Sequence, residues 1–291
     1  MSEAVSEPVR RGKVQCASAS GLHRMAYVEW GERDNPNVLV CVHGLTRCAR
    51  DFDFLAAALA SRYRVVCPDV AGRGDSDWLR NPMEYTVPVY AGDMVTLIAR
   101  LGVDSVHWVG TSLGGLIGMT IAAMPESPIT KLVLNDVGPV LTAAALERIG
   151  SYVGSWPPLP NIEAAEQFVR STGASFGTHS DAEWRFLTEH VVRSNRDGSL
   201  RMHYDPAIAV AFKAELPHRD VELWKFYDAI RSPTLVLRGE QSDLLRRDTA
   251  EEMRKRGPRA RGVEIPGVGH APTLIHADQI AIVRDFLLRD G

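Results

Sequence analysis

The chain has 291 residues, of which 45% are hydrophobic and 24% are charged, and its net charge at pH 7 is −3. This is the composition of an ordinary globular protein, and the length allows a large core. The weak negative charge gives no reason to expect a nucleic-acid partner. No apolar run approaches the roughly 20 residues that a membrane helix needs, so we expect no membrane partner either.

The N-terminus and the cysteines suggest where the protein resides. Residues 1–12 contain no apolar stretch of the signal-peptide type, and we expect them to form a flexible tail. The four cysteines include no CxxC pair, so their spacing supports neither a zinc site nor a redox site; they are Cys16, Cys41, Cys48 and Cys67. We therefore expect a cytoplasmic protein without a metal ion or other cofactor. The sequence leaves the oligomeric state open.

The first half of the chain alternates between apolar runs and helical patterns. Val14–Ser18 and His23–Trp30 flank Gly21 and predict an antiparallel hairpin. Continuous apolar runs, typical of strands buried on both faces, follow at Val38–Val42, Val65–Cys67, Val106–Val109 and Leu132–Leu134. Helical patterns lie between them at Phe52–Leu59, Val89–Leu101 and Leu113–Met124. This alternation predicts a parallel sheet covered by helices on both faces.

The alternation stops after Pro139 and resumes after about Ile230. Between these points we find amphipathic helical segments and no run of the buried-strand type, and Asp205 and Pro206 are typical of the start of a helix. Beyond them come strand patterns at Thr234–Leu237 and Val263–Ile265, and helical patterns near Thr249–Lys255 and Asp278–Leu288. The sequence thus predicts one α/β domain, residues 13–139 and 231–291, with a helical insertion at 140–230.

Ser112 lies between Gly110 and Gly114, where the third buried strand of the alternating region meets a helix. A sharp strand-to-helix turn would lift the serine hydroxyl off the sheet, and side chains two residues to either side would clash. Serine at neutral pH is a weak nucleophile that needs a positioned base and donors for the oxyanion. We therefore interpret Ser112 as a nucleophile and search the chain for these partners.

His270 is the best candidate for the base, because it follows the last predicted strand in a tight loop with glycines at 267 and 269. The acid that orients it should follow the preceding strand, which favours Asp243. Glu240 in the same loop and Asp136, which follows the strand ending at Leu134, remain alternatives. With Asp243 the three residues occur in the order serine, acid, histidine that is expected for such a sheet.

Two backbone N–H groups should stabilise the oxyanion. One belongs to Leu113, the residue after the nucleophile, and the other to the loop after the first buried strand, where Gly44 lets the chain turn and Leu45 is the expected donor. His43 in the same loop is more consistent with a structural role, bonded to the backbone.

Together these motifs resemble the α/β-hydrolase family from about Gly12 onward. The stretches that carry the resemblance are Val42–Gly44, Asp69–Ser76, Gly110–Gly114, Arg238–Asp243 and Gly267–His270. The resemblance implies a mostly parallel, doubly wound sheet of about eight strands with an inserted all-helical cap over the active site. Trp156, Phe212 and Trp224, together with Tyr227, are the candidates to bind substrate from that cap, although each could equally belong to the cap's own core.

The family includes esterases, lactonases, perhydrolases and C–C bond hydrolases. It also includes dehalogenases and epoxide hydrolases, but these use an aspartate as nucleophile and position 112 of this chain is a serine. We predict a serine hydrolase that cleaves small-molecule carboxylic esters of short or medium acyl chains through an acyl-enzyme. A lactonase is one alternative. A C–C bond hydrolase of a ring-cleavage product is another, and its acidic substrate would need cap cations such as Arg185, Arg193 or Arg201. A ligand-binding protein on the same scaffold is a third, but such proteins usually lack an intact triad.

Overall fold

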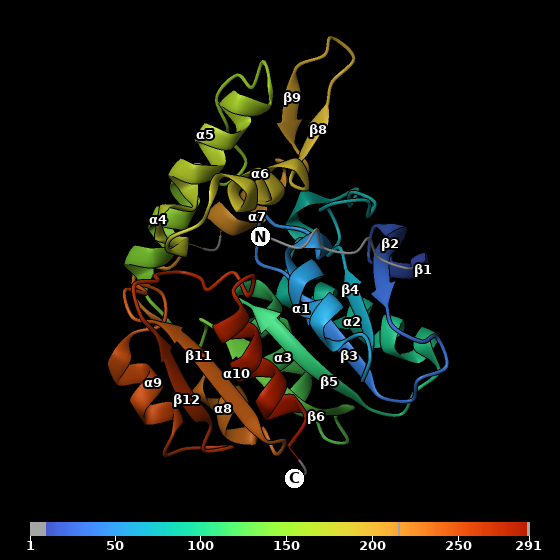
Figure 1. Cartoon of the computed structure of the whole chain (residues 1–291), viewed down its shortest axis with the longest axis vertical. Coiled ribbons are helices and arrows are strands. Elements are labelled where there is room, and N and C mark those ends of the chain that lie inside the picture. The colour runs from blue at the N-terminus through green and yellow to red at the C-terminus, as the bar shows by residue number, and fades with distance from the viewer. Residues whose placement is uncertain (1–9, 215, 290–291) are drawn as a thin grey trace.

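The computed structural model describes residues 10–214 and 216–289, and an eight-stranded sheet lies at its centre (Figure 1). Its strands, in their order across the sheet, are β1 (Arg10–Ser18), β2 (Gly21–Trp30), β4 (Arg64–Pro68), β3 (Val38–Val42), β5 (Val106–Thr111), β6 (Ile129–Asn135), β11 (Thr234–Gly239) and β12 (Arg261–Ile265). The β1–β2 and β2–β4 pairs are antiparallel, and the other neighbours are parallel. The predicted class, a mostly parallel sheet of about eight strands, is confirmed.

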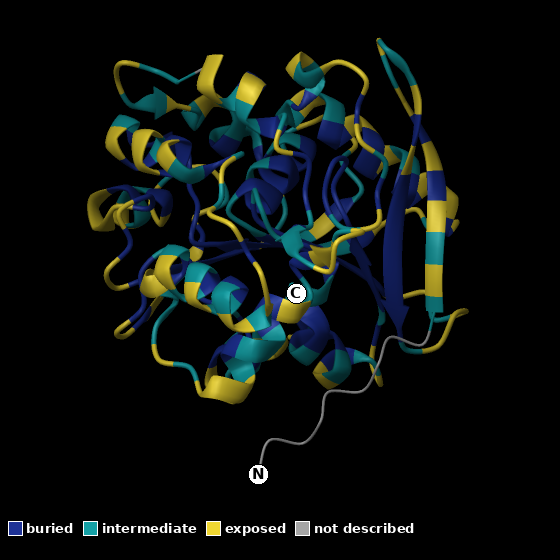
Figure 2. Cartoon of the chain, turned by 90° about the horizontal axis from the view of Figure 1, so that it is seen from above, coloured by how far each residue is buried: buried dark blue, intermediate teal, exposed yellow. Residues whose placement is uncertain are grey.

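Helices cover both faces of the sheet, as the apolar strands predicted. Strand β3 is buried throughout and divides its side chains: Leu39 and Cys41 pack into one apolar cluster, and Val40 and Val42 pack into the other. The helices of the first face are α1 (Asp53–Leu59) and α10 (Ala277–Leu287); those of the second include α2 (Val87–Leu101), α3 (Leu113–Ala122), α8 (Trp224–Ala229) and α9 (Arg247–Met253). Figure 2 shows the buried strands between helices whose outer surfaces are exposed.

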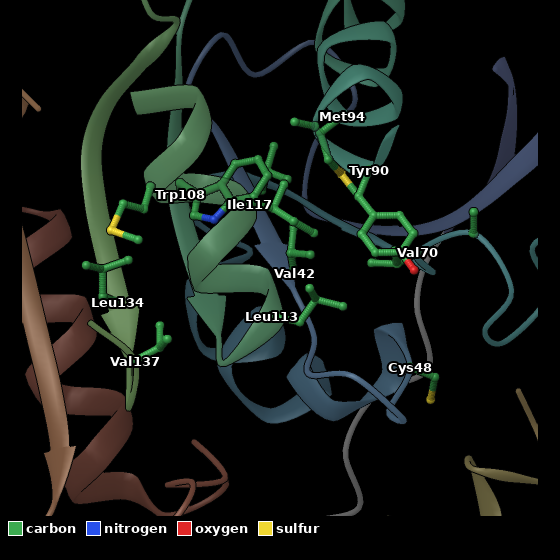
Figure 3. Close-up of a cluster of buried hydrophobic side chains, with 14 of the residues drawn as sticks. Val42, Cys48, Val70, Tyr90, Met94, Trp108, Leu113, Ile117, Leu134 and Val137 are labelled. Atoms are coloured by element: carbon green, nitrogen blue, oxygen red, sulfur yellow. The ribbon is translucent and has the colours of Figure 1, made fainter. Parts of the chain in front are cut away.

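Close packing between α3 and β5 fixes the start of α3. The Trp108 side chain of β5 is fully buried and its Nε1 donates to the Gly114 carbonyl oxygen at 3.0 Å. Figure 3 shows Trp108 beside Ile117 in the cluster under this helix. A Cβ at Gly118 would lie 2.3 Å from Trp108 Nε1, so only glycine lets the helix approach this closely.

The insertion between β6 and β11 lies above the carboxyl end of the sheet (Figure 1). Its helices are α4 (Ala143–Tyr152), α5 (Ile162–Thr172), α6 (Asp181–Glu189) and α7 (Ile208–Ala214). It also contains two antiparallel pairs, β7 (Val140–Leu141) with β10 (Val221–Glu222) and β8 (Val192–Ser194) with β9 (Leu200–Met202). The prediction that the insertion is all-helical was therefore wrong, because strands of two or three residues are too short to show an alternating pattern. Short 3-10 turns complete the fold at η1 (Ala49–Phe52), η2 (Pro82–Glu84) and η3 (Ala174–Phe176).

Two predicted boundaries need correction. Helix α8, placed within the insertion by the sequence, packs against α3, and its Tyr227 hydroxyl donates to the Met253 carbonyl oxygen of α9 at 2.6 Å. The insertion therefore ends before α8 rather than at residue 230. The expected tail of 12 residues is also too long, because β1 begins at Arg10; residues 1–9 lie outside the described part of the chain. In that described part, no helix combines the length and apolarity needed to cross a membrane.

Gly118 and Gly92 provide a matched test of the close packing between α3 and β5. Gly118→Val should lower the free energy of unfolding by about 2–3 kcal/mol, because the new side chain would have to displace buried Trp108. Gly92→Ala in α2 should raise it by about 0.5–1 kcal/mol, because a Cβ there meets no atom within 4 Å and alanine favours the helix. Urea unfolding measures both changes. Equal effects in the two variants would contradict this account of the α3 contact.

Candidate active site

Ser112 occupies the turn between β5 and α3 in a strained backbone conformation, with φ 52° and ψ −113°. The adjacent glycines make this turn possible. A Cβ at Gly110 would lie 2.2 Å from the Gly114 carbonyl oxygen, and a Cβ at Gly114 would lie 2.0 Å from the Val42 carbonyl oxygen. The turn therefore has the geometry predicted from the glycine spacing, with the serine at the amino end of α3.

His270 lies in the loop after β12, and its Nε2 is 2.9 Å from Ser112 Oγ. The insertion holds this loop in place through Ser175, which accepts from the Gly269 N–H at 2.6 Å and donates from its hydroxyl to the His270 carbonyl oxygen at 2.6 Å. The imidazole is mostly buried, with 12% of the side chain exposed. The structure thus brings together the serine and the histidine that the sequence predicted.

The acid beside His270 is Asp136, whose Oδ2 lies 2.8 Å from His270 Nδ1. Asp136 directly follows β6 and is completely buried. Its carboxylate also accepts from the Gly239 N–H at 2.8 Å and from the Ser242 hydroxyl at 2.6 Å. Three donors therefore compensate for burial of the charge. Because Nδ1 faces the carboxylate, it carries the ring proton and leaves Nε2 to accept from the serine.

The prediction of Asp243 as the orienting acid is contradicted by this geometry. The Asp243 carboxylate does not bond to His270. It forms a bidentate ion pair with Arg148 of α4, at 2.6 and 2.9 Å, and 47% of its side chain is exposed. The rival Glu240 does not bond to the imidazole either: its carboxylate accepts from the Gly267 N–H at 2.9 Å. The sequence signal for Asp136 was its place directly after a buried strand, and β6 turns out to be the neighbour of the serine-bearing β5.

The Leu45 and Leu113 N–H groups have the character expected of oxyanion donors. Both residues line the cavity that contains Ser112, and within residues 10–214 and 216–289 neither amide has a hydrogen-bond acceptor. His43 holds the loop that carries Leu45: its Nδ1 bonds to the Gly44 carbonyl oxygen at 2.7 Å, and its Nε2 accepts from the Val70 N–H at 3.0 Å. Burial lowers the pKa of His43 to about 4, so the ring is neutral, in agreement with its predicted structural role.

Arg73, for which the sequence predicted no separate role, is a second support of the same loop. It is fully buried, and its Nε donates to the Leu45 carbonyl oxygen at 2.8 Å. One terminal nitrogen donates to the Ala71 carbonyl oxygen at 2.7 Å and to the Tyr90 hydroxyl at 2.9 Å. Its place between Gly72 and Gly74 in the Asp69–Ser76 motif was the available signal. No carboxylate of the described residues forms an ion pair with Arg73, so hydrogen bonds to neutral oxygens are its contacts behind the site.

A cavity of about 420 Å³ opens beside Ser112 between the sheet and the insertion. Every described residue that lines it is uncharged, and most are aliphatic or aromatic; beyond Ser112 they are Leu45, Tyr85, Thr86, Val87, Pro88, Tyr90, Leu113, Leu116, Met119, Thr120, Leu141, Leu146, Ile149, Ile208, Ala211, Phe212, Leu216, Pro217, Val221, Leu223, Phe226 and Leu244. The site therefore accommodates a neutral, largely apolar group.

Only one of the four aromatic residues named as candidates to bind substrate lines this cavity, and Tyr227 is not that residue. The residue that lines it is Phe212 of α7. Trp156 packs instead against Tyr204, with ring centroids 5.5 Å apart, and Trp224 packs beneath Arg256 on the core side of the molecule. The prediction failed for both tryptophans because an aromatic side chain can bury itself in many places, and the sequence does not say which.

One group in the described part of the chain has the donor atoms for a metal ion. Cys16, His23 and Asp93 are buried, and their ligand atoms lie within 4.8 Å of one another. His23 Nε2 and Asp93 Oδ2 already bond to each other at 2.9 Å, which joins β2 to α2. None of the three lines the Ser112 cavity.

Comparisons with known proteins agree with this fold. Residues 37–277 match the family described as the alpha/beta hydrolase fold. The chain is 51% identical over 289 residues, 97% of this chain and 99% of the relative, to a 3-hydroxybutyrate-oligomer hydrolase of Cupriavidus necator. It superposes with a TM-score of 0.84 on an alpha/beta hydrolase from Novosphingobium aromaticivorans at 36% identity, covering 95% and 98% of the two chains. A solved protein from Rickettsia typhi gives a TM-score of 0.91 at 31% identity, covering 97% and 100%.

The roles of Asp136 and Asp243 can be distinguished by the rate at which a fluorophosphonate labels Ser112. Asp136→Asn should slow labelling by about 10³- to 10⁴-fold, because an amide no longer holds the imidazole tautomer that accepts the serine proton. Asp243→Asn is the matched control and should stay within about threefold, because an exposed ion pair contributes little. Circular dichroism verifies that both variants are folded. A normal rate for Asp136→Asn with a slow rate for Asp243→Asn would restore the original assignment.

Proposed function

Because the chain belongs to the alpha/beta hydrolase fold family and is a hydrolase, we propose that it cleaves the ester bonds of short 3-hydroxybutyrate oligomers with Ser112 as nucleophile. The observation that carries this proposal is the chain of hydrogen bonds from Ser112 through His270 to Asp136 beside an uncharged cavity. The name of the Cupriavidus necator relative, similar over nearly its whole length, supports this substrate class.

In this mechanism the Ser112 oxygen attacks the acyl carbon of the ester as its proton passes to His270 Nε2. The Asp136 carboxylate keeps the proton on Nδ1 and stabilises the imidazolium that forms. The N–H groups of Leu45 and Leu113 donate to the oxyanion, and loss of one such donor typically costs about 3 kcal/mol in the barrier. The imidazolium then protonates the leaving alcohol, and an acyl-enzyme remains on Ser112.

The second half of the reaction uses the same groups in the reverse sense. His270 Nε2 takes a proton from a water molecule, whose oxygen attacks the acyl carbon, and the oxyanion returns to the same two N–H groups. The imidazolium gives its proton back to Ser112 Oγ as the bond to the acyl group breaks. The free acid leaves, and the serine is regenerated. One ester bond and one water molecule are consumed in each turnover.

The charge of the cavity does not choose between an ester and the acidic substrate of a C–C bond hydrolase, because a 3-hydroxybutyrate oligomer also carries a carboxylate; the ester is favoured by the relative named above. The expected C–C bond hydrolase would bind the carboxylate of its dienoate with cations of the insertion. The three cap arginines considered for this purpose do not line the cavity. Arg185 pairs with Glu166 at 2.8 Å, and Arg193 pairs with Asp75.

Purified protein should convert the dimer and trimer of 3-hydroxybutyrate to monomer, as measured by chromatography of the acid products. Ser112→Ala should lower kcat by at least about 10⁴-fold, because only binding and the oxyanion donors then remain. Residual turnover within tenfold of the wild type would exclude Ser112 as the nucleophile. Turnover of nitrophenyl butyrate without turnover of either oligomer would support a serine esterase but would contradict 3-hydroxybutyrate oligomers as its substrate class.

A further inference from the structure

The cavity beside Ser112 contains few polar groups, and most of these are already engaged. Among the described lining residues, Tyr85 donates its hydroxyl proton to Asp205 at 2.5 Å and accepts from the Leu79 N–H at 2.8 Å. Thr120 donates its hydroxyl proton to the Leu116 carbonyl oxygen of its own helix at 2.9 Å. Neither hydroxyl therefore has a proton to offer to a substrate. The Thr86 hydroxyl also lines the cavity and has no hydrogen-bond partner among the described residues, but Thr86 is only half-buried, so water can satisfy it.

The Tyr90 hydroxyl is in a different state. Its oxygen accepts a hydrogen bond from the guanidinium of Arg73 at 2.9 Å, and the residue is only 2% exposed. No acceptor for the hydroxyl proton is present in the described part of the chain. Burial raises the pKa of Tyr90 above its usual value, so the phenol stays protonated at neutral pH. Tyr90 lines the cavity, and its hydroxyl is an uncommitted donor that the buried Arg73 guanidinium polarises.

Arg73 also relates Tyr90 to the reacting end of the cavity. The same guanidinium donates to the Tyr90 hydroxyl and to the Leu45 carbonyl oxygen. The Tyr90 hydroxyl and the backbone of Leu45, whose N–H we assign to the oxyanion, are therefore bound to the same guanidinium. Arg73 itself is completely buried and does not line the cavity, so the substrate meets Tyr90 rather than the charge.

The charge of the substrate decides which half of the ester enters the cavity. An oligomer of 3-hydroxybutyrate ends in a carboxylate on the alcohol side of its last ester bond. The described lining offers that carboxylate no cation, and burying it unpaired would be costly. The acyl half, which ends in a neutral hydroxyl, is the half that this cavity accepts.

We propose that Tyr90 is a specificity-determining residue whose hydroxyl donates to the oxygen that a 3-hydroxyacyl group carries and a plain acyl group lacks. The inference rests on the proposed function and adds the group that selects the acyl chain. A plain acyl chain would leave the Tyr90 donor desolvated without an acceptor. A site built to bond a substrate oxygen rejects the analogue without that oxygen for this reason.

The test compares nitrophenyl 3-hydroxybutyrate with nitrophenyl butyrate, which differ only in the 3-hydroxyl group. The wild type should prefer the hydroxylated ester in kcat/KM. Tyr90→Phe should lower the ratio of the two kcat/KM values by about 10- to 100-fold, mainly by slowing the hydroxylated ester. The ratio does not depend on the fraction of folded enzyme, so partial loss of stability does not affect the reading.

Tyr85→Phe is the matched control in the same cavity. The Tyr85 hydroxyl is already bonded to Asp205 and to the Leu79 N–H, so its removal should change both esters by a similar factor and keep the ratio within about threefold. A Tyr90→Phe ratio equal to that of the wild type would overturn the role of Tyr90 while the esterase stands. Failure of the wild type to cleave either ester would overturn the proposed function and this inference with it.

Discussion

The hydrogen bond between the buried carboxylate of Asp136 and Nδ1 of His270 is the contact on which the site depends. It selects the imidazole tautomer in which Nε2 can accept the proton of Ser112. A charge with no exposure to solvent is tolerated only because the N–H of Gly239 and the hydroxyl of Ser242 also donate to it. These two donors come from the end of β11 and the loop after it. The pairing of β11 with β6 therefore extends the sheet and also places the donors that stabilise the Asp136 carboxylate.

The parallel sheet explains how residues far apart in the sequence meet. Ser112 and Asp136 follow the adjacent strands β5 and β6, and His270 reaches them from the loop after β12. The insertion is part of this arrangement, because Ser175 bonds to the His270 loop on one side of the site. On the other side, Arg73 and His43 hold the loop of Leu45 by hydrogen bonds to its backbone. The positions of the reacting groups therefore depend on the insertion as well as on the sheet.

The features that the sequence could predict are those set by local chemistry. The glycines around Ser112 are required by the turn itself, and the apolar runs of the parallel strands are required by burial on both faces. The choice of acid was different, since Asp136 and Asp243 both follow strands of the sheet. What separates them in the structure is the partner of each carboxylate: Asp136 bonds to His270, and Asp243 pairs with Arg148 of the insertion. The sequence does not reveal such distant partners. The same limit applies to Trp156 and Trp224, whose burial depends on neighbours far along the chain.

The central claim, that Asp136 orients His270, can be tested most directly by proton NMR of the enzyme with ¹⁵N-labelled histidine. A short hydrogen bond from an imidazole N–H to a carboxylate shifts its proton far downfield. We expect two such signals, one coupled to Nε2 of His23, which bonds to Asp93, and one coupled to Nδ1 of His270. The His270 signal should be present in the wild type and in Asp243→Asn and should be lost in Asp136→Asn. A His270 signal that persists in Asp136→Asn and disappears in Asp243→Asn would contradict the account.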